Sequence, residues 1–303
     1  MDLFKRPLSP DPGESSAPSD TTDDKQQWHP PITLRTLARW MREDTKFACL
    51  TAYDATTARW LQRAGVPVLL VGDTAGEVIL GYSNTIHTPL DFLVTITAAV
   101  KRGAPSTFVM ADMPFLSYQA DEAEGIRNAG RFMTEGLADA VKIEVDGSFA
   151  DLVGRMSRAG IPVVAHIGAR PQQSMLKGGY FSVGKTAETA RRIINDARLL
   201  EEAGAVMLLL EAIPEAVSRI IVERAGVPVI GCGAGVSCNG QIVVLQDLLG
   251  LTDWQPGFAP PLCQMGTTLM ESATNWIDRV ERGDLPPLPY EMDMDELRKL
   301  ELD

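Results

Sequence analysis

Three carboxylates stand where short apolar runs of this chain end. Asp73, Asp112 and Glu144 each lie within two residues of the last apolar position of such a run. Carboxylate oxygens are hard ligands that suit Mg²⁺. The chain has only 3 His and 4 Cys, without a CxxC pair, which argues against a zinc site. We therefore expect Asp73, Asp112 and Glu144 to bind Mg²⁺.

A magnesium ion held in this way keeps coordination positions free for a substrate. A 2-oxo acid chelates such an ion through its carboxylate and ketone, which polarises the ketone and stabilises an enolate. Lys142 lies two residues before Glu144 in an extended run, so both side chains point to one face. The Lys142 ammonium would add positive charge near the substrate carboxylate or the oxyanion. Glu211 ends a separate run and is the candidate general base for the proton next to the ketone.

Several of these residues also have a structural explanation. An Asp or Glu after a strand often caps the next helix, although four of them at run ends favour a shared site. A single histidine such as His166 is more often structural than catalytic. The glycine-rich segment 231–235 fits either a tight turn or a close backbone approach to a ligand.

The elements that would bring these residues together are short apolar runs separated by amphipathic segments. The segment 187–203 is typical, with apolar residues at helical spacing. Buried strands that alternate with helices indicate a parallel sheet, and ~250 residues favour a (β/α)8 TIM barrel over an open doubly wound sheet. The active site of such a barrel lies at the carboxyl ends of its strands. The predicted strands are 47–51, 68–71, 108–111, 140–143, 163–165, 206–210, 227–230 and 242–245, and the last of these also fits the start of a helix.

The barrel is expected to form one catalytic domain over residues 32–282. Residues 1–31 are rich in Pro, Ser, Asp and Gly and are expected to be a disordered acidic tail. Residues 283–303 are expected to be an extended Pro-rich segment followed by an acidic stretch with a short helix.

Charge and composition exclude several classes of protein. The net charge is −12, and most of it lies in the two ends, so the nearly balanced body argues against nucleic-acid binding. No apolar run reaches the ~18 residues of a membrane span. Four scattered cysteines suit a reducing cytosol, and the N-terminus lacks a signal sequence, so we expect a cytoplasmic protein.

The chain resembles the ketopantoate hydroxymethyltransferase (3-methyl-2-oxobutanoate hydroxymethyltransferase) family of the phosphoenolpyruvate/pyruvate barrel superfamily. The similar segments follow in collinear order over about residues 45–252. They are LTAYD from Leu50, VGDTAG from Val71, AAVKRGAP from Ala98, ADMPF from Ala111, AVKIE from Ala140, PVVAHIG from Pro162, GGY from Gly178, LLLEAIP from Leu208, and PVIGCGAG from Pro228 followed by NGQIVVLQDLLGL.

The resemblance implies transfer of a hydroxymethyl group from 5,10-methylenetetrahydrofolate to 2-oxoisovalerate, giving ketopantoate for pantothenate synthesis. It also implies a homo-oligomer, since members of the family are commonly decamers. The implied roles are Mg²⁺ binding by Asp73, Asp112 and Glu144, contact of Thr74 and Lys142 with the substrate carboxylate, Glu211 as the base, and His166 beside the substrate.

Four positions depart from the usual pattern of the family, namely Tyr82, Ile96, Arg170 and Asn239. They leave the exact 2-oxo acid and the one-carbon donor open. One alternative is therefore a divergent paralogue with aldol- or lyase-type chemistry on another 2-oxo acid, although no convincing catalytic cysteine loop is present. The other alternative is a non-catalytic barrel, which the retained charged residues disfavour.

Overall fold

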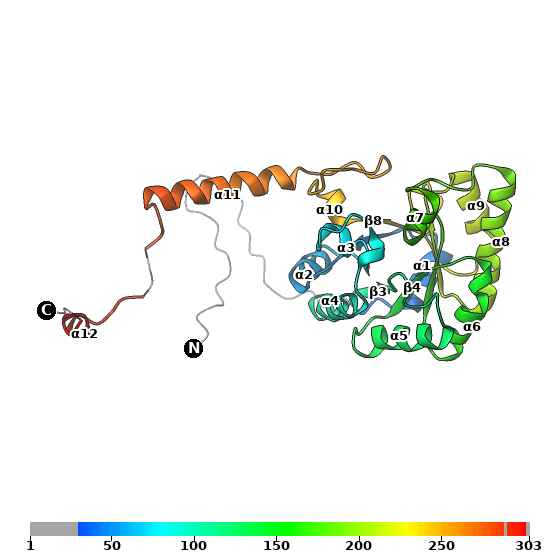
Figure 1. Cartoon of the computed structure of the whole chain (residues 1–303), viewed down its shortest axis with the longest axis horizontal. Helices are drawn as coiled ribbons and strands as arrows, with labels where there is room; N and C mark the ends of the chain where they lie inside the picture. Colours follow the sequence, from blue (N-terminus) through cyan, green and yellow to red (C-terminus); the bar gives the residue numbers. More distant parts are fainter. Residues whose placement is uncertain (1–29, 288–289, 301–303) are drawn as a thin grey trace.

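Eight parallel strands close into a barrel in the order of the chain, and β1 pairs with β8. The computed structural model describes residues 30–287 and 290–300. The expected disordered tail therefore lies almost entirely outside the described residues. The predicted (β/α)8 TIM barrel is confirmed (Figure 1). Its strands are β1 (Phe47–Thr51), β2 (Val68–Val71), β3 (Phe108–Asp112), β4 (Ala140–Glu144), β5 (Val163–Gly168), β6 (Met207–Glu211), β7 (Val229–Cys232) and β8 (Gly240–Val243).

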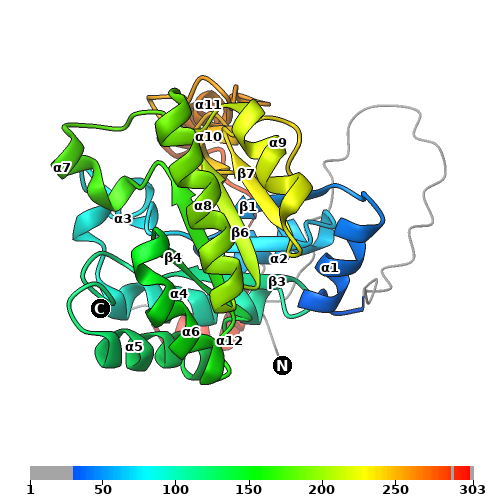
Figure 2. The ribbon, with the colours of Figure 1, turned by 90° about the vertical axis from the view of Figure 1, so that its right-hand side faces the viewer.

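Helices cover the outside of the barrel (Figure 2). The predicted helix over 187–203 is confirmed as α8, which begins with a capping box between Thr186 and Thr189 and ends at Gly204 in the left-handed conformation. The α-helices are α1 (Leu34–Arg42), α2 (Ala55–Arg63), α3 (Ala75–Val78), α4 (Leu90–Gly103), α5 (Glu122–Thr134), α6 (Ala150–Arg158), α7 (Ser174–Lys177), α8 (Ala187–Ala203), α9 (Glu215–Arg224), α10 (Leu245–Leu248), α11 (Met265–Arg282) and α12 (Met294–Arg298). Short 3₁₀ helices are η1 (Thr85–His87), η2 (Gly147–Phe149) and η3 (Pro171–Gln173).

The eighth strand begins and ends two residues earlier than the predicted strand 242–245. The chain leaves the sheet after Val243, and Leu245 begins α10. The Leu245 amide donates to the Thr51 hydroxyl of β1 at 2.9 Å, which holds the start of α10 against the barrel. The segment is therefore a strand that is followed by a helix, so the strand and the helix start that the sequence predicts are each confirmed in part.

Alternate residues of each strand belong to two different apolar layers. Phe108 and Met110 of β3 join the inner core of the barrel, whereas Val109 and Ala111 pack outwards against the helices. This alternation follows from the two-residue repeat of a strand. The residue two positions beyond Met110 is Asp112, so the inward face of β3 continues into a carboxylate.

Helix α1 lies against the amino-terminal end of the barrel. Its Leu37 is fully buried and belongs to the inner core together with Phe47 at the start of β1. The Ile32 amide donates to the Ser106 carbonyl at 2.8 Å and anchors the chain before the helix. The barrel is thus closed at the end opposite the carboxyl ends of its strands.

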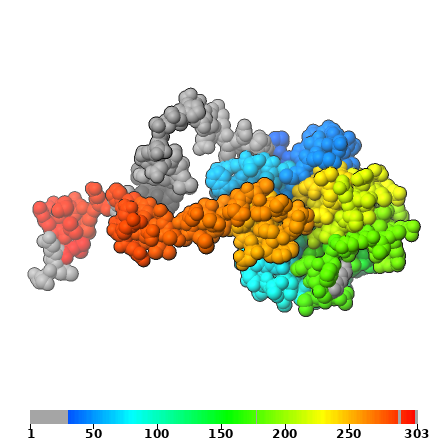
Figure 3. All heavy atoms as spheres, turned by 90° about the horizontal axis from the view of Figure 1, so that it is seen from above, coloured from blue at the N-terminus to red at the C-terminus, as the bar shows by residue number. Residues whose placement is uncertain are grey.

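Helix α11 leaves the barrel and extends away from it (Figures 1 and 3). Its first turn is tied to the barrel by the Met265 amide, which donates to the Leu249 carbonyl at 2.9 Å. The helix buries none of its 18 residues. Across residues 30–287 and 290–300, no helix combines the length and apolar character needed to cross a membrane.

Replacing Leu37 by Ala should destabilise the protein, because Leu37 packs α1 against the inner core of the barrel. The change leaves a cavity in a fully buried site and is expected to lower the free energy of unfolding by about 2–5 kcal/mol. Urea unfolding measures this loss. Arg35→Ala, at an exposed position of the same helix, serves as the control and should change stability by less than about 0.5 kcal/mol. Equal stability of both variants would contradict the role assigned to α1.

Candidate active site

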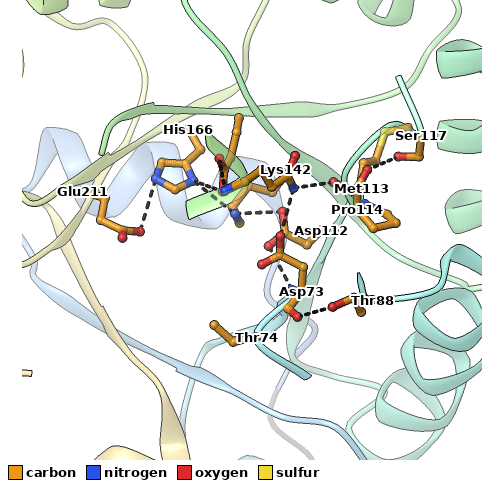
Figure 4. A network of polar contacts seen from close by, with 12 residues as sticks. Asp73, Thr74, Thr88, Asp112, Met113, Pro114, Ser117, Lys142, His166 and Glu211 are labelled. Carbon is orange, nitrogen blue, oxygen red and sulfur yellow. Dashed lines mark hydrogen bonds and ion pairs between the residues drawn. The ribbon is translucent and has the colours of Figure 1, made fainter. Parts of the chain in front are cut away.

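Charged side chains gather at the carboxyl ends of β3–β6, on the inward face of the barrel (Figure 4). The strand registers pair Asp112 with Lys142 and Glu144 with His166. Glu211 ends β6, opposite Gly168 of β5. Asp73 joins them from the loop after β2. Every charged residue that the sequence placed in the site therefore lies at this end of the barrel.

The helix-cap explanation does not account for these carboxylates. The caps of the helices that follow them are Thr74, Asp121 and Pro214 for α3, α5 and α9, and Asp146 caps η2. The side chains of the four site carboxylates are thus free to face the interior. Asp54 shows the contrast, since its side chain accepts from Thr56 and Thr57 and caps α2.

Asp73 and Asp112 are in direct contact. The Asp73 amide donates to Asp112 Oδ2 at 3.2 Å, and the Thr88 hydroxyl donates to the Asp73 carbonyl at 2.8 Å. Both carboxylates are almost completely buried, with residue exposures of 4% and 1%. Burial and the charge of Asp112 raise the pKa of Asp73 well above its usual value.

Lys142 links this pair to His166. Its Nζ lies 2.8 Å from Asp112 Oδ1 and 3.2 Å from His166 Nδ1. Burial by itself lowers the pKa of the ammonium, but the charges of Asp112, Asp73 and Glu144 raise it further, and the net pKa is above the usual value. Lys142 is therefore charged, forms an ion pair with Asp112 and donates to His166.

His166 connects Lys142 to Glu211. Burial and the charge of Lys142 lower the pKa of His166, so the ring is neutral near pH 7. An ammonium only donates, which makes Nδ1 the acceptor and places the ring proton on Nε2. Nε2 lies 3.3 Å from Glu211 Oε2, and the Glu211 side chain is 23% exposed. Glu211 is thus held at the open edge of an otherwise buried network.

The buried charges do not balance. Asp73, Asp112 and Glu144 face one ammonium, Lys142, and burial together with the charge of Asp73 raises the pKa of Glu144 well above its usual value. Glu144 Oε1 is buried and has no hydrogen-bond partner. Two uncompensated negative charges and a free carboxylate oxygen are what a divalent cation would satisfy.

The donor set suits Mg²⁺ in the way that it usually binds. Within residues 30–287 and 290–300, no three His, Cys, Asp or Glu side chains converge as a complete metal centre. Mg²⁺ does not need one, because it commonly takes one or two carboxylates and completes its shell with water and substrate oxygens. Asp73 and Asp112, with Glu144 beside them, fit that arrangement.

The sequence missed two residues that support this cluster, Gln172 and Tyr118. Gln172 is buried in η3, and its amide group donates to Asp73 Oδ2 at 2.9 Å. The Tyr118 hydroxyl accepts from the Glu144 amide at 2.9 Å. Both residues lie in loops after strands, where no apolar run marks them.

Thr74 and the glycine-rich turn occupy the edges of the site. The Thr74 hydroxyl makes no cap contact with α3 and lies 2.7 Å from the Tyr53 hydroxyl, so Tyr53 is a further neighbour that the sequence missed. Gly233 has a positive φ of 60°, and a Cβ there would meet the ring of Phe258 at 2.7 Å. Close packing thus explains the glycine at position 233 without a ligand.

The four departures from the family pattern are spread over the molecule. Asn239 lies at the opposite end of the barrel, where its side chain accepts from the Val229 amide at 2.9 Å. Ile96 belongs to α4 and packs outside the strands. Arg170 follows β5 at the site end and pairs with Asp146 at 2.8 Å, and Tyr82 is exposed. Asn239 and Ile96 therefore do not contact the charged cluster.

Without metal, the protein should lose stability as the pH rises. Asp73 and Glu144 have folded-state pKa values above their unfolded values. Their contribution to stability is complete below the unfolded pKa, near pH 4, and is lost as the pH rises through the folded pKa. Urea unfolding in EDTA between pH 5 and 8 should show this fall, and Mg²⁺ should reverse it most strongly at pH 8.

Asp73→Asn separates this effect from general metal binding. The amide removes one buried charge but still offers an oxygen to Gln172, so the metal-free variant should be more stable than the parent at pH 8. It should also gain less stability from Mg²⁺. Asp151→Asn, on α6 away from the cluster, is the control and should behave as the parent protein. A metal-free Asp73→Asn variant less stable than the parent would contradict the charge imbalance.

Comparison with known proteins identifies the family of this chain. A family model described as ketopantoate hydroxymethyltransferase matches residues 31–287. The chain is 43% identical over 258 residues to the 3-methyl-2-oxobutanoate hydroxymethyltransferase of Syntrophobacter fumaroxidans, covering 85% of this chain and 92% of the relative. It is 39% identical over 259 residues to the enzyme of that name from Geobacillus thermodenitrificans, covering 85% and 93%.

Solved structures share the fold. A 2,3-dimethylmalate lyase of the PEP mutase/isocitrate lyase superfamily superposes with a TM-score of 0.55 at 20% identity, covering 89% of this chain and 95% of that chain. A phosphonopyruvate hydrolase solved with oxalate and Mg⁺⁺ gives a TM-score of 0.56 at 12% identity, with coverage of 89% and 95%. The family match over most of the barrel shows that this chain belongs to the ketopantoate hydroxymethyltransferase family.

Proposed function

We propose that this protein transfers a hydroxymethyl group from 5,10-methylenetetrahydrofolate to 2-oxoisovalerate and so forms ketopantoate, a step of pantothenate synthesis. The observation that carries the proposal is the buried carboxylate cluster with Glu211 at its open edge. Membership of the family and the names of its relatives supply the substrate class. The neutral His166 between Lys142 and Glu211 supplies the arrangement for proton removal.

Asp73 and Asp112 would hold Mg²⁺, with Glu144 completing the site in part through water. When bound, Mg²⁺ supplies Lewis-acid polarisation of the ketone of the 2-oxo acid. The two positive charges of the ion would match the two uncompensated negative charges of the cluster. Thr74 and Lys142 would bind the substrate carboxylate, and Lys142 keeps its charge because of the carboxylates around it.

Glu211 would act as the base. Its carboxylate would take the proton from C3 of the substrate, and the electrons of that C–H bond would form the C2–C3 double bond of the enolate. His166 presents Nε2 to Glu211 Oε2 at 3.3 Å, and this contact would orient the carboxylate and keep its other oxygen toward the substrate. The new carbon–carbon bond would join C3 to the one-carbon unit, whose two bonds to the folate nitrogens break. Water would supply the hydroxyl oxygen, and tetrahydrofolate would leave after its two nitrogens take one proton from the substrate and one from water.

A lyase-type reaction on another 2-oxo acid is the second candidate. Cys232 lies opposite Glu211 in the β6–β7 register. Burial and the charge of Glu211 raise the pKa of its thiol well above the usual value, so Cys232 is a poor acid and a poor nucleophile. This observation favours the transferase.

We also propose that the protein is a cytoplasmic homo-oligomer. Its four cysteines, all within the described residues, are free, which suits a reducing compartment. Helix α11 exposes large apolar side chains along its length, including Leu269, Trp276 and Val280 at 63%, 56% and 49%. Among the described residues this helix is tied to the barrel by its first turn and buries none of its side chains, and such an exposed apolar face is typical of a contact between subunits.

Proton exchange tests the activity. In D₂O with Mg²⁺, the protein should exchange the C3 proton of 2-oxoisovalerate, as followed by proton NMR. Glu211→Gln should slow this exchange at least ~100-fold, the usual contribution of a general base. Adding methylenetetrahydrofolate to the parent protein should yield ketopantoate.

The control for the exchange experiment is Glu223→Gln, an equal change of charge at an exposed position of α9, which should exchange as the parent does. Folded, Mg²⁺-loaded protein without exchange would exclude 2-oxoisovalerate. Exchange that survives Glu211→Gln would exclude Glu211 as the base. Exchange without ketopantoate would exclude the folate donor.

The mass in solution tests the oligomer. Light scattering after size exclusion should give a multiple of the 32.9 kDa chain mass. Trp276→Asp, which places a charge on the apolar face of α11, should lower that mass. Asn275→Asp adds the same charge one residue earlier and should leave the mass unchanged. A monomeric parent protein, or two variants of equal mass, would contradict the role of α11.

A further inference from the structure

We propose that Gln172 is a positioning residue that orients Asp73 and Glu144 for the metal ion. The inference rests on the proposed function and deepens it, because it assigns how a carboxylate of the loop after β2 and a carboxylate at the end of β4 are aligned. Gln172 touches neither the base Glu211 nor Lys142 among its hydrogen bonds, so it acts through the carboxylates alone.

Gln172 binds one oxygen of each carboxylate. Its side-chain Nε2 donates to Asp73 Oδ2 at 2.9 Å and to the Met113 carbonyl at 3.0 Å. Its backbone amide donates to Glu144 Oε2 at 3.1 Å. A single residue of η3 therefore joins the loop after β2 to the end of β4.

The direction of the Gln172 amide is fixed by its neighbours. Gln119 Nε2 donates to Gln172 Oε1 at 2.9 Å, and the Tyr118 hydroxyl lies 3.2 Å from the same oxygen. The Gln119 donor on one side and the Asp73 carboxylate on the other require the Gln172 oxygen to face Gln119, so the NH₂ group must face Asp73. A rotated amide would put its oxygen against a carboxylate oxygen and is excluded by repulsion.

This arrangement leaves the opposite carboxylate oxygen available. Glu144 Oε2 accepts from the backbone amide of Gln172, whereas Glu144 Oε1 is buried and has no hydrogen-bond partner. An unpartnered carboxylate oxygen in a buried site is costly unless a ligand satisfies it. Gln172 thus determines which oxygen of Glu144 faces the metal.

A merely structural role would have a different signature. Gln172 is only 4% exposed, so any substitution is expected to reduce stability. A packing role would reduce stability and leave the metal affinity of the folded protein unchanged. A positioning role weakens metal affinity even in a fully folded variant.

Mn²⁺ binding, followed by the EPR signal of the free ion, distinguishes the two roles without any assay of activity. Gln172→Met keeps the length of the side chain and removes its polar contacts with Asp73. It should weaken Mn²⁺ binding 10–100-fold, the usual effect of losing a residue that orients a metal ligand. Gln62→Met is the control: it is the same change in α2 at the amino-terminal end of the barrel, where Gln62 accepts from the Ser106 amide at 2.8 Å, and it should leave Mn²⁺ binding unchanged.

Thermal unfolding of the metal-free variants verifies that they are folded. If Gln172→Met does not fold, Gln119→Met replaces it, because this change removes the donor that holds the Gln172 oxygen and should weaken Mn²⁺ binding ~3–10-fold. Parent protein that binds no Mn²⁺ would refute the proposed function. Parent protein that binds Mn²⁺ with the same affinity as these folded variants would refute the positioning role alone.

Discussion

Three carboxylates buried around one ammonium are the constraint on which the rest of this structure depends. Asp73, Asp112 and Glu144 are each at most 4% exposed, and Lys142 is the buried cation that faces them. Water cannot stabilise charges at such depth, so neighbouring donors and a bound cation must do so. The loops around the cluster accordingly supply backbone amides and the Gln172 side chain. The cluster by itself is thus poorly balanced in charge, as expected of a site that awaits the proposed metal ion.

The barrel meets this constraint through the alternation of its strands. The inward face of β3 holds Phe108 and Met110 toward the closed end of the barrel and Asp112 at the open end. The inward face of β4 likewise ends in Lys142 and Glu144. Apolar layers therefore lie beneath the charges and exclude water from below. Register pairs such as Asp112 with Lys142 bring opposite charges together across adjacent strands without any long-range adjustment.

The same alternation explains what the sequence can predict. Strand ends identified the inward carboxylates, Lys142, His166 and Glu211, because an apolar run marks each strand. Gln172 and Tyr118 lie in loops, where position depends on how the chain returns to the barrel, so no local pattern marked them. Asn239 shows the reverse, since a changed motif suggested a site position although the residue lies at the other end of β8. The ligand, base and substrate roles depend on groups that bind to the protein, and they stay predictions.

Closure of the barrel beneath the site has a kinetic consequence. The inner core, with Leu37 at its amino-terminal end, lies beneath the charged cluster, so within the described residues reactants and products would reach the cluster from the carboxyl ends of the strands. In the proposed reaction, the small 2-oxo acid would lie against the buried cluster, and the much larger folate donor would lie above it, toward the open edge marked by Glu211. The donor then blocks the path of the acid, which imposes a compulsory order: the oxo acid enters first, and the spent folate departs before ketopantoate.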